Sequence, residues 1–243
     1  MKKIFILLFI AFTTVASAQK GDIYVVAIGI SNYQNLSDLR LPDKDAKDIA
    51  ELYKTHTNYV ILLTGKYATN VKIFQSLKDQ FSRAKEEDTI IFSFSGHGYP
   101  GGICPFDMTR NGDKGISFRE IHHILKQSRA KRKIIFADAC FSGGIRTNTS
   151  TSNQAQTEAD VLLLLSSRSN EVSIEGPLMA NGFFTTYLLR GLRGGADTDK
   201  NRLITAKELF QFVSQGVKKR SNDQQHPVMW GKFDDNYVIM NWK

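Results

Sequence analysis

The fold is decided by two stretches, Ile90-Ile91-Phe92-Ser93-Phe94-Ser95-Gly96-His97-Gly98 and Lys133-Ile134-Ile135-Phe136-Ala137-Asp138-Ala139-Cys140-Phe141-Ser142-Gly143-Gly144. Each is an apolar run of strand length, rich in residues that favour strands and broken by glycine. Neither run alternates polar with apolar residues. Both are therefore predicted to be strands buried on two faces, as in a parallel sheet covered by helices.

Each of these runs ends in a reactive side chain, His97 in the first and Cys140 in the second. In open α/β sheets, sites lie at the carboxyl ends of the strands, near the point where the strand order reverses. If the two strands are neighbours, an imidazole and a thiol meet at one edge of the sheet. A thiol nucleophile with a histidine partner requires that geometry. Either residue alone is better explained as an inert packed side chain, but their shared placement favours a catalytic pair.

The composition is that of one globular domain with a core, since the 243 residues are 42% hydrophobic and 23% charged. Residues 1–18 have the pattern of a signal peptide, with Lys2 and Lys3, an apolar centre at 4–12, and a small-residue cleavage site at 16–18. No apolar stretch is long enough to span a bilayer. The sequence predicts an exported protein, periplasmic or secreted, with a mature domain over 19–243 and no membrane partner.

The positive charge does not indicate a nucleic-acid partner. The formal net charge of +8 falls to +6 once Lys2 and Lys3 are removed, and the two basic clusters, 129–133 and 218–220, lie where helices should end. Cations are favoured at helix C-termini in any case. We expect a monomer that binds no nucleic acid. Export would permit a disulfide between Cys104 and Cys140, but a bridge would inactivate a nucleophile, so Cys104 is expected to pack within its loop.

Strands and helices are predicted to alternate along the chain. The pattern gives strands at 22–30, 59–63, 89–95, 133–139, 161–165 and 237–240, and helices at 42–55, 69–84, 117–127, 182–192 and 205–219. Ser117 with Glu120 has the spacing of a capping box. This order predicts an α/β fold with a mostly parallel six-stranded sheet and helices on both faces. A polar, low-complexity segment at about 145–158 is predicted to be a flexible loop.

Polar residues precede both reactive side chains on the same face of their strands. Asp138 stands two residues before Cys140, and Ser95 stands two residues before His97. A carboxylate beside a thiol would raise the pKa of that thiol, so Asp138 is better suited to the floor of a pocket for a cationic side chain. The alternative is an ionic residue that ties a helix to the sheet. Backbone amides at Gly98 and Cys140 are candidates for an oxyanion hole.

The stretches around His97 and Cys140 resemble the motifs of a known family. Ser95-Gly96-His97-Gly98 and Asp138-Ala139-Cys140-Phe141-Ser142-Gly143 are similar to the histidine and cysteine motifs of metacaspases and the wider caspase-like cysteine peptidases, and the resemblance covers nearly the whole mature chain. It implies a three-layer caspase-like sandwich. It also implies hydrolysis of a peptide bond through a thioester at Cys140, with no cofactor required for the chemistry.

The resemblance further implies a set of substrate-binding residues. In the Leu41–Ala46 segment, Asp45 matches an aspartate of the primary pocket, and with Ser95 and Asp138 it would hold arginine or lysine of a protein or peptide substrate. The further residues that resemble substrate-binding positions of the family are Asp107, Ser166 and Ser167. True caspases favour aspartate, which Asp138 would repel. Members of this family are often cut after the nucleophile strand, and self-processing is predicted after Arg146.

Two other functions are compatible with the sequence. A catalytically idle caspase-like module that binds a protein partner is the main alternative, and a basic surface-binding protein with an incidental pocket is a weaker one. The presence of both His97 and Cys140 favours the peptidase, because a binding module need not keep the pair.

A second motif lies between the last two predicted helices. Residues 197–208 match an EF-hand loop at positions 1, 3, 5, 9 and 12, but the sixth position, usually glycine, is Arg202. The motif predicts calcium ligands at Asp197, Asp199, Asn201, Leu203, Thr205 and Glu208. The alternative is a turn closed by Thr205, which would cap the following helix in a capping box with Glu208.

Overall fold

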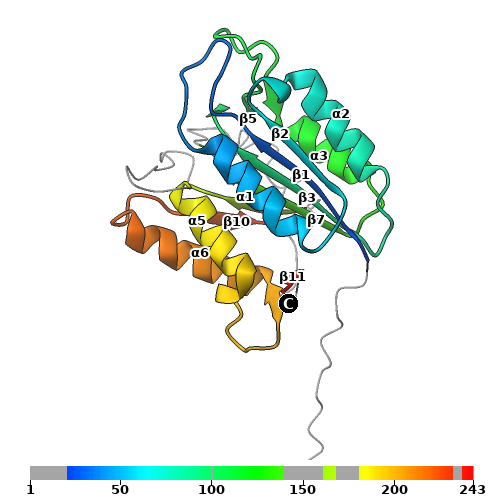
Figure 1. The fold of residues 1–243 in the computed structure, drawn as a ribbon, viewed down its shortest axis with the longest axis vertical. Helices are drawn as coiled ribbons and strands as arrows, with labels where there is room; N and C mark the ends of the chain where they lie inside the picture. The colour runs from blue at the N-terminus through cyan, green and yellow to red at the C-terminus, as the bar shows by residue number, and fades with distance from the viewer. Residues whose placement is uncertain (1–20, 100, 140–160, 168–180, 232–236, 243) are drawn as a thin grey trace, which may run out of the picture.

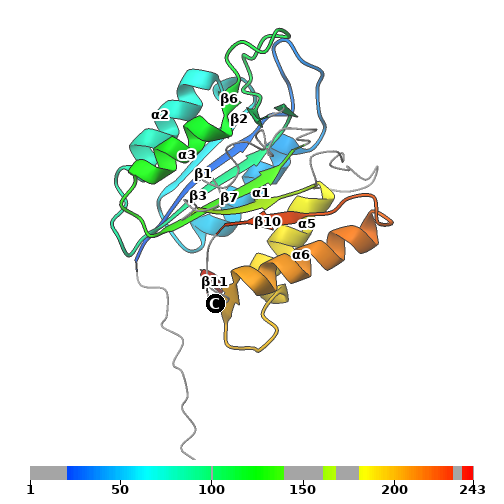
Figure 2. The same ribbon diagram turned by 180° about the vertical axis from the view of Figure 1, so that it is seen from behind.

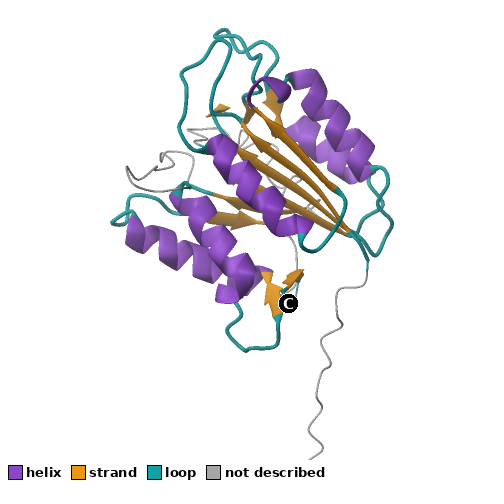
Figure 3. Ribbon diagram, viewed as in Figure 1, coloured by secondary structure: helices purple, strands orange, loops and turns teal. Residues whose placement is uncertain are grey.

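The computed structural model describes residues 21–99, 101–139, 161–167, 181–231 and 237–242. Its centre is a six-stranded sheet with the strand order β10-β8-β7-β3-β1-β2 (Figure 1, Figure 3). All neighbours are parallel except β10, which runs antiparallel to β8. The strands are β1 (Ile23–Gly29), β2 (Val60–Thr64), β3 (Thr89–Ser95), β7 (Arg132–Asp138), β8 (Val161–Leu165) and β10 (Val228–Trp230).

Helices cover both faces of this sheet. Helices α1 (Pro42–Lys54), α5 (Phe183–Arg190) and α6 (Ala206–Arg220) lie on the face turned to the viewer in Figure 1, and α2 (Asn70–Phe81) and α3 (Phe118–Gln127) lie on the other, as the reverse view in Figure 2 shows. Short turns of 3-10 helix (Gly65–Tyr67) and π-helix (Gly191–Gly195) follow β2 and α5. The predicted three-layer sandwich is confirmed.

Each central strand feeds two hydrophobic cores. Along β1, Tyr24, Val26 and Ile28 pack into the core beneath α2 and α3. The alternate residues Ile23, Val25 and Ala27 pack into the core beneath α1, α5 and α6. Because successive side chains of a strand point to opposite faces, a strand covered on both sides must be apolar throughout. This is the physical reason for the uninterrupted apolar runs in the sequence.

The helices begin where the sequence offers caps. The Thr69 hydroxyl accepts a hydrogen bond from Lys72 N (3.4 Å) at the start of α2. Ser117 and Glu120 form a full capping box at α3, as Thr205 and Glu208 do at α6. These side chains satisfy backbone N–H groups that have no partner inside the helix, so the predicted starts of α3 and α6 are confirmed.

Two small sheets stand beside the main one. Strands β4 (Gly98–Tyr99), β5 (Gly102–Ile103) and β6 (Ile116–Ser117) follow the histidine stretch, and β9 (Leu203–Thr205) pairs with β11 (Val238–Asn241). The strand predicted at 237–240 therefore forms, but outside the main sheet. The sixth strand of the main sheet is β10, which the sequence pattern did not predict.

None of the helices in the described residues is both long enough and apolar enough to cross a bilayer. The signal peptide predicted at 1–18 and the loop predicted at about 145–158 both lie outside the described residues.

One buried tyrosine in the core leads to a prediction about stability. Tyr53 of α1 is fully buried, and its hydroxyl has no hydrogen-bond partner within the described part of the chain. A buried polar atom without a partner costs free energy that an apolar group of the same shape does not. We expect Tyr53→Phe to raise the free energy of unfolding by about 1 kcal/mol, measured by urea denaturation. A loss of stability would indicate a hydrogen bond to that hydroxyl.

Candidate active site

The two deciding stretches are neighbours in the sheet. Strands β3 and β7 run parallel with Ser95 opposite Asp138, and Gly96 N donates to Asp138 O (3.2 Å). The alternate residues of both strands, Ile91 on β3 and Phe136 on β7, pack on the α1–α5–α6 face. Ser95 stands four residues after Ile91, and Asp138 stands two residues after Phe136. Because side chains of a strand alternate between its two faces, the side chains of Ser95 and Asp138 leave the sheet on that same face. The carboxyl ends of the two strands, which precede His97 and Cys140 in the sequence, therefore lie side by side at one edge of the sheet.

An acidic cluster forms where these strand ends meet the first turn of α1. Asp45 is 3% exposed. Its Oδ2 accepts a hydrogen bond from the Ser95 hydroxyl (2.9 Å), and its Oδ1 accepts from Asn181 Nδ2 (2.9 Å) and Gly182 N (3.3 Å). Asp45 and Ser95, predicted to share a pocket, are therefore in direct contact.

Asp138 completes this cluster from β7. It is 8% exposed, and its Oδ2 accepts hydrogen bonds from the Thr185 hydroxyl (3.0 Å) and Thr185 N (3.3 Å) in the first turn of α5. A methyl group built on Gly182 would lie 2.7 Å from Asp138 Oδ2 and 3.6 Å from Asp45 Oδ2. Both carboxylates thus lie against Gly182, where a larger residue would clash with Asp138.

The electrostatics of the cluster disfavour two negative charges. Burial raises the pKa of Asp45, the nearby Asp138 raises it further, and hydrogen bonds from Asn181 and Ser95 only partly offset these effects, so the pKa rises to about 8. Within the described residues, no lysine or arginine pairs with Asp45.

The His97 ring is held by the loop between β1 and α1. Its Nε2 lies 2.8 Å from Ser37 O, and its ring centroid is 4.9 Å from that of Tyr33. The Tyr33 hydroxyl accepts a hydrogen bond from His97 N (2.7 Å). Because a carbonyl oxygen only accepts, Nε2 carries a hydrogen and Nδ1 is the nitrogen that can take a proton from another group. This is the orientation a general base needs.

Cys140 and Arg146 lie outside the described residues, which end on this side of the gap at Ala139. The Ser166 hydroxyl, at the end of β8, accepts from Ala139 N and donates to Ala139 O (both 3.2 Å), and Gln225 Nε2 donates to Ser166 O (2.9 Å). Ser166 and Ser167 are both buried. The Ser166 side chain therefore supports the strand end that precedes Cys140; a substrate contact by either serine stays a prediction.

Asp107 has different partners from those expected of a pocket residue. Its Oδ1 accepts from Asn70 N (2.8 Å) at the start of α2, and its Oδ2 pairs with Lys114 Nζ (3.1 Å). None of its described contacts reaches Asp45 or Asp138. An acceptor at this place satisfies an otherwise unpaired helix N–H, so Asp107 fixes the position of α2. Gly98 opens β4 directly after His97, and its role in an oxyanion hole stays a prediction.

Four residues of this site were missed in the sequence. Asn181, Thr185, Tyr33 and Ser37 contact Asp45, Asp138 or His97 from segments distant in the chain. Ser37 contacts His97 Nε2 with its backbone carbonyl (2.8 Å) and with its hydroxyl (3.3 Å), and a lone serine in a polar loop gives no signal for either contact. The glycine at 182 before an apolar helix indicated the start of α5. It did not indicate that this start lies against the carboxylates of Asp45 and Asp138.

The predicted calcium loop lies between α5 and α6. Carboxylate oxygens of Asp197, Asp199 and Glu208 are within 4.8 Å of one another. Asp197 and Asp199 accept backbone hydrogen bonds from within the loop, and Arg202 has a left-handed φ of 67° at the position where glycine is usual. Burial alone would raise the pKa of Glu208, but hydrogen bonds from Thr205 and Thr198 outweigh it, so the pKa is lowered. The capping box of the alternative interpretation is present.

The other predicted ligands, Asn201, Leu203 and Thr205, lie in the same loop, with the Leu203 N–H bonded to Asn201 Oδ1 (2.7 Å). Calcium binding stays a prediction. We expect calcium to raise the melting temperature by several degrees by binding only the folded state, and Asp199→Asn to abolish that shift, measured by calorimetry. Equal melting temperatures with calcium and with chelator would contradict calcium binding and favour the alternative, a turn closed by the capping box.

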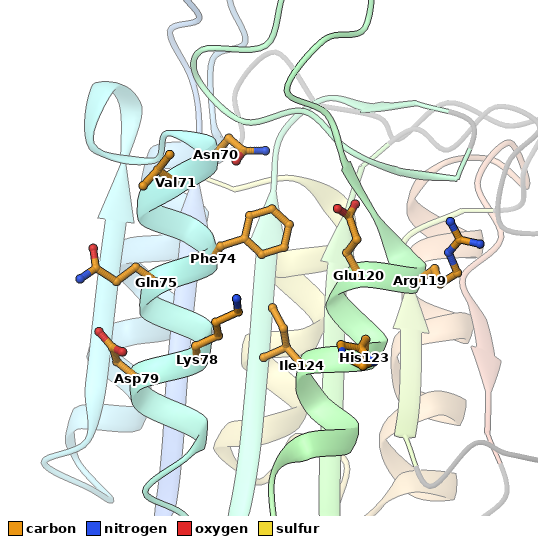
Figure 4. Close-up of a pocket in the computed structure, with 10 residues that line it drawn as sticks. All are labelled: Asn70, Val71, Phe74, Gln75, Lys78, Asp79, Arg119, Glu120, His123 and Ile124. Atoms are coloured by element: carbon orange, nitrogen blue, oxygen red, sulfur yellow. The ribbon is translucent and has the colours of Figure 1, made fainter.

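A groove of about 790 Å³ lies on the opposite face of the sheet. It lies between α2 and α3, with Phe74 and Lys78 on one side and Glu120, His123 and Ile124 on the other (Figure 4). None of the predicted site residues lines it, so its size is no guide to the chemistry of the strand ends.

The fold and the site together define a caspase-like protein: a six-stranded sheet between helices, with histidine, cysteine and acidic residues assigned to the carboxyl ends of its central strands. The sequence profile of the Caspase domain family matches residues 23–237, and the chain belongs to that family. The members of this family are generally cysteine peptidases.

Solved structures share the fold at low sequence identity. Protein GSU0716 from Geobacter sulfurreducens superposes with a TM-score of 0.66 at 20% identity, covering 91% of this chain and 100% of that one. Caspase-1 from Spodoptera frugiperda superposes with a TM-score of 0.67 at 15% identity, covering 93% of this chain and 91% of that one. No curated protein sequence matches the chain.

Proposed function

We propose that the protein is a secreted cysteine endopeptidase that hydrolyses peptide bonds after arginine or lysine. The observation that carries this proposal is the pairing of β3 with β7, which sets Ser95 opposite Asp138 and leads the chain to His97 on one strand and to Cys140 on the other. Ala139, the last described residue before Cys140, is one peptide bond, or about 3.8 Å between Cα atoms, from the nucleophile.

In the proposed reaction, His97 Nδ1 takes the proton of the Cys140 thiol, and the thiolate attacks the carbonyl carbon of the substrate. The carbonyl oxygen becomes an oxyanion near the backbone amides of Gly98 and Cys140. The C–N bond breaks as His97 returns the proton to the leaving amine. Water then attacks the thioester carbon while His97 accepts its proton. The C–S bond breaks as His97 returns that proton to the Cys140 sulfur, which releases the acid product and restores the thiol. The Ser37 carbonyl keeps Nδ1 in position throughout.

The proposed specificity rests on the acidic cluster. Asp45 and Asp138 are buried, converge on Gly182, and have among the described residues no basic partner at Asp45. A guanidinium or ammonium group placed between them would be a charge-assisted hydrogen-bond donor to both carboxylates. An aspartate side chain in the same place would be repelled, which argues against the specificity of true caspases.

Activity assays with matched variants test this proposal. We expect the mature protein to turn over arginyl and lysyl fluorogenic peptides, to leave an aspartyl peptide intact, and to lose all turnover on Cys140→Ala. Cys104→Ala is the matched control, because Cys104 is a buried free thiol, and its contact with His97, from Cys104 N to His97 O (3.0 Å), is made by the backbone and would be kept. Absence of Cys140-dependent turnover with every peptide, with and without calcium, would favour the alternative of an idle protein-binding module.

Export and self-processing belong to the same proposal and rest on the sequence. Residues 1–18 would direct export, and cleavage after Arg146 would be catalysed by the enzyme itself. Mass spectrometry of the purified protein beside Cys140→Ala distinguishes the two cleavages. Removal of residues 1–18 should occur in both proteins, and cleavage after Arg146 only in the protein that keeps Cys140. Identical uncut masses in the two proteins would contradict self-processing and leave the peptidase activity open to the assay above.

A further inference from the structure

We infer that Asn181 is a positioning residue that selects which oxygen of Asp45 faces the bound cation. This inference rests on the proposed function, since it assigns a specificity role within the same acidic site. Asn181 stands immediately before α5 and is 8% exposed.

The amide of Asn181 is fully committed to carboxylates. Its Nδ2 donates to Asp45 Oδ1 (2.9 Å) and to Asp48 Oδ2 (2.9 Å), which uses both of its hydrogens. Asp48 is in turn held by Lys44 Nζ, at 2.6 Å and 2.9 Å from its two oxygens. The buried acid is thereby tied, through one amide, to an ion pair on the outer side of α1.

This arrangement distinguishes the two oxygens of Asp45. Oδ1 accepts from both Asn181 and Gly182 N, so it is occupied. Among the residues that the structure describes, Oδ2 accepts from the Ser95 hydroxyl alone, and it lies 3.6 Å from the point where a Gly182 side chain would begin. Asp138 Oδ2 is 2.7 Å from the same point. Asn181 therefore turns Asp45 so that the oxygen with remaining acceptor capacity faces its counterpart on Asp138.

Charged and polar groups face Asp45 from each described element that is packed against it. Asp138 faces it from β7, Asp48 shares its amide donor on α1, Ser95 contacts it from β3, and the start of α5 supplies two N–H donors. The hydrogen bond from Asn181 stabilises the ionised form of Asp45, since it lowers the pKa of that carboxyl against the effect of burial.

Two substitutions with opposite chemistry test the role of Asn181. Asn181→Ala removes the amide, and Asn181→Asp keeps its shape but adds a third carboxylate. For arginyl peptides, we expect the KM of Asn181→Ala to be about tenfold higher than that of wild type, with kcat within about twofold. We expect the KM of Asn181→Asp to be higher still. A residue that only fills space would show the reverse order, because aspartate matches asparagine in size.

A stability measurement gives a readout independent of catalysis. In the Cys140→Ala background, the difference in melting temperature between Asn181 and Asn181→Ala proteins should grow as the pH rises from 4 to 9, because the lost hydrogen bond matters most to ionised carboxylates. Asn70→Ala is the matched control: its Nδ2 donates to a backbone carbonyl, Lys114 O (2.8 Å), so its difference should be constant with pH.

The two measurements separate the inference from the proposed function. If wild type lacks peptidase activity but the Asn181→Ala difference grows with pH, the proposed function fails and the positioning of Asp45 stands. A difference that is constant with pH, or a KM in Asn181→Asp at or below that of Asn181→Ala, overturns the inference.

Discussion

Replacing His97 by alanine is expected to lower kcat/KM for arginyl peptides by at least about 10³-fold, because the variant lacks the group that deprotonates the nucleophile and later protonates the leaving amine. The ring is partly exposed and its contacts are with Ser37 and Tyr33 in a surface loop. The fold should therefore tolerate the substitution, and the loss should be in kcat. Peptide hydrolysis and the melting temperature measured on the same samples check both statements.

His123→Ala is the matched control for this prediction. His123 lies on α3 in the groove on the other face of the sheet (Figure 4). Its Nε2 is 3.0 Å from Gln127 Nε2. Its removal should leave kcat/KM within about twofold. The double variant of His97 and Cys140 should be no slower than Cys140→Ala alone, because residues that act as one unit are not additive. Substantial activity in His97→Ala would contradict the proposed base.

Asp45→Asn is expected to affect activity and stability in opposite directions. Truncating one partner of a buried, hydrogen-bonded charge pair costs about 2–5 kcal/mol, which corresponds to about 30-fold to several thousand-fold in kcat/KM for basic peptides. Because the countercharge is lost in the complex with substrate, the effect should fall mainly on KM. Hydrolysis of arginyl and lysyl peptides over a range of concentrations measures it.

The free protein should gain stability from the same substitution. The pKa of Asp45 is raised in the folded state, to about 8 from 3.8, so between these pH values the folded state binds more protons than the unfolded state. The free energy of unfolding then decreases as the pH rises across this window. Asp45→Asn carries no such titration, and at pH 8 we expect it to exceed wild type by at least about 1 kcal/mol.

Urea denaturation at pH 4, 6 and 8 checks the sign of this effect. The difference between Asp45→Asn and wild type should be smallest at pH 4 and largest at pH 8. Asp79→Asn is a suitable control, since Asp79 lies on α2 on the opposite face of the sheet. A difference that declines with pH would mean that Asp45 is ionised and stabilising in the free protein.

The sequence was informative where burial or capping imposes a local pattern. Residues 89–95 had to be apolar on both faces, so β3 was predicted with its observed bounds, and the capping boxes at Ser117 and Thr205 marked the starts of α3 and α6. These features depend on neighbours within one element, and a single sequence contains them. The sequence indicated that β3 and β7 are both central strands, but only the structure shows that they are neighbours.

Contacts between distant segments left no such pattern. Strand β10 has only three residues and is partly exposed, so neither length nor alternation distinguishes it from a loop. Asn181 is 136 positions from Asp45 in the chain, and Asp107 is 37 from Asn70. Whether an acidic residue lines a pocket or caps a helix depends on which element the chain brings beside it. Only the resemblance to a family indicated that Asp45 lies beside Ser95, and neither the pattern nor the resemblance indicated the contact of Asp107 with Asn70.

The pairing of β7 with β8 has a consequence for any break in the chain between them. The segment that joins them spans 139–160, while the strands themselves are adjacent over five residue pairs, from Lys133 with Val161 to Ala137 with Leu165. The amino-terminal fragment would keep β1, β2, β3 and β7, and the carboxyl-terminal fragment would keep β8 and β10 with α5 and α6. Such a nicked protein should migrate as two bands in denaturing gels yet elute from a sizing column as one particle, with Asp45 on one fragment still bonded to Asn181 on the other.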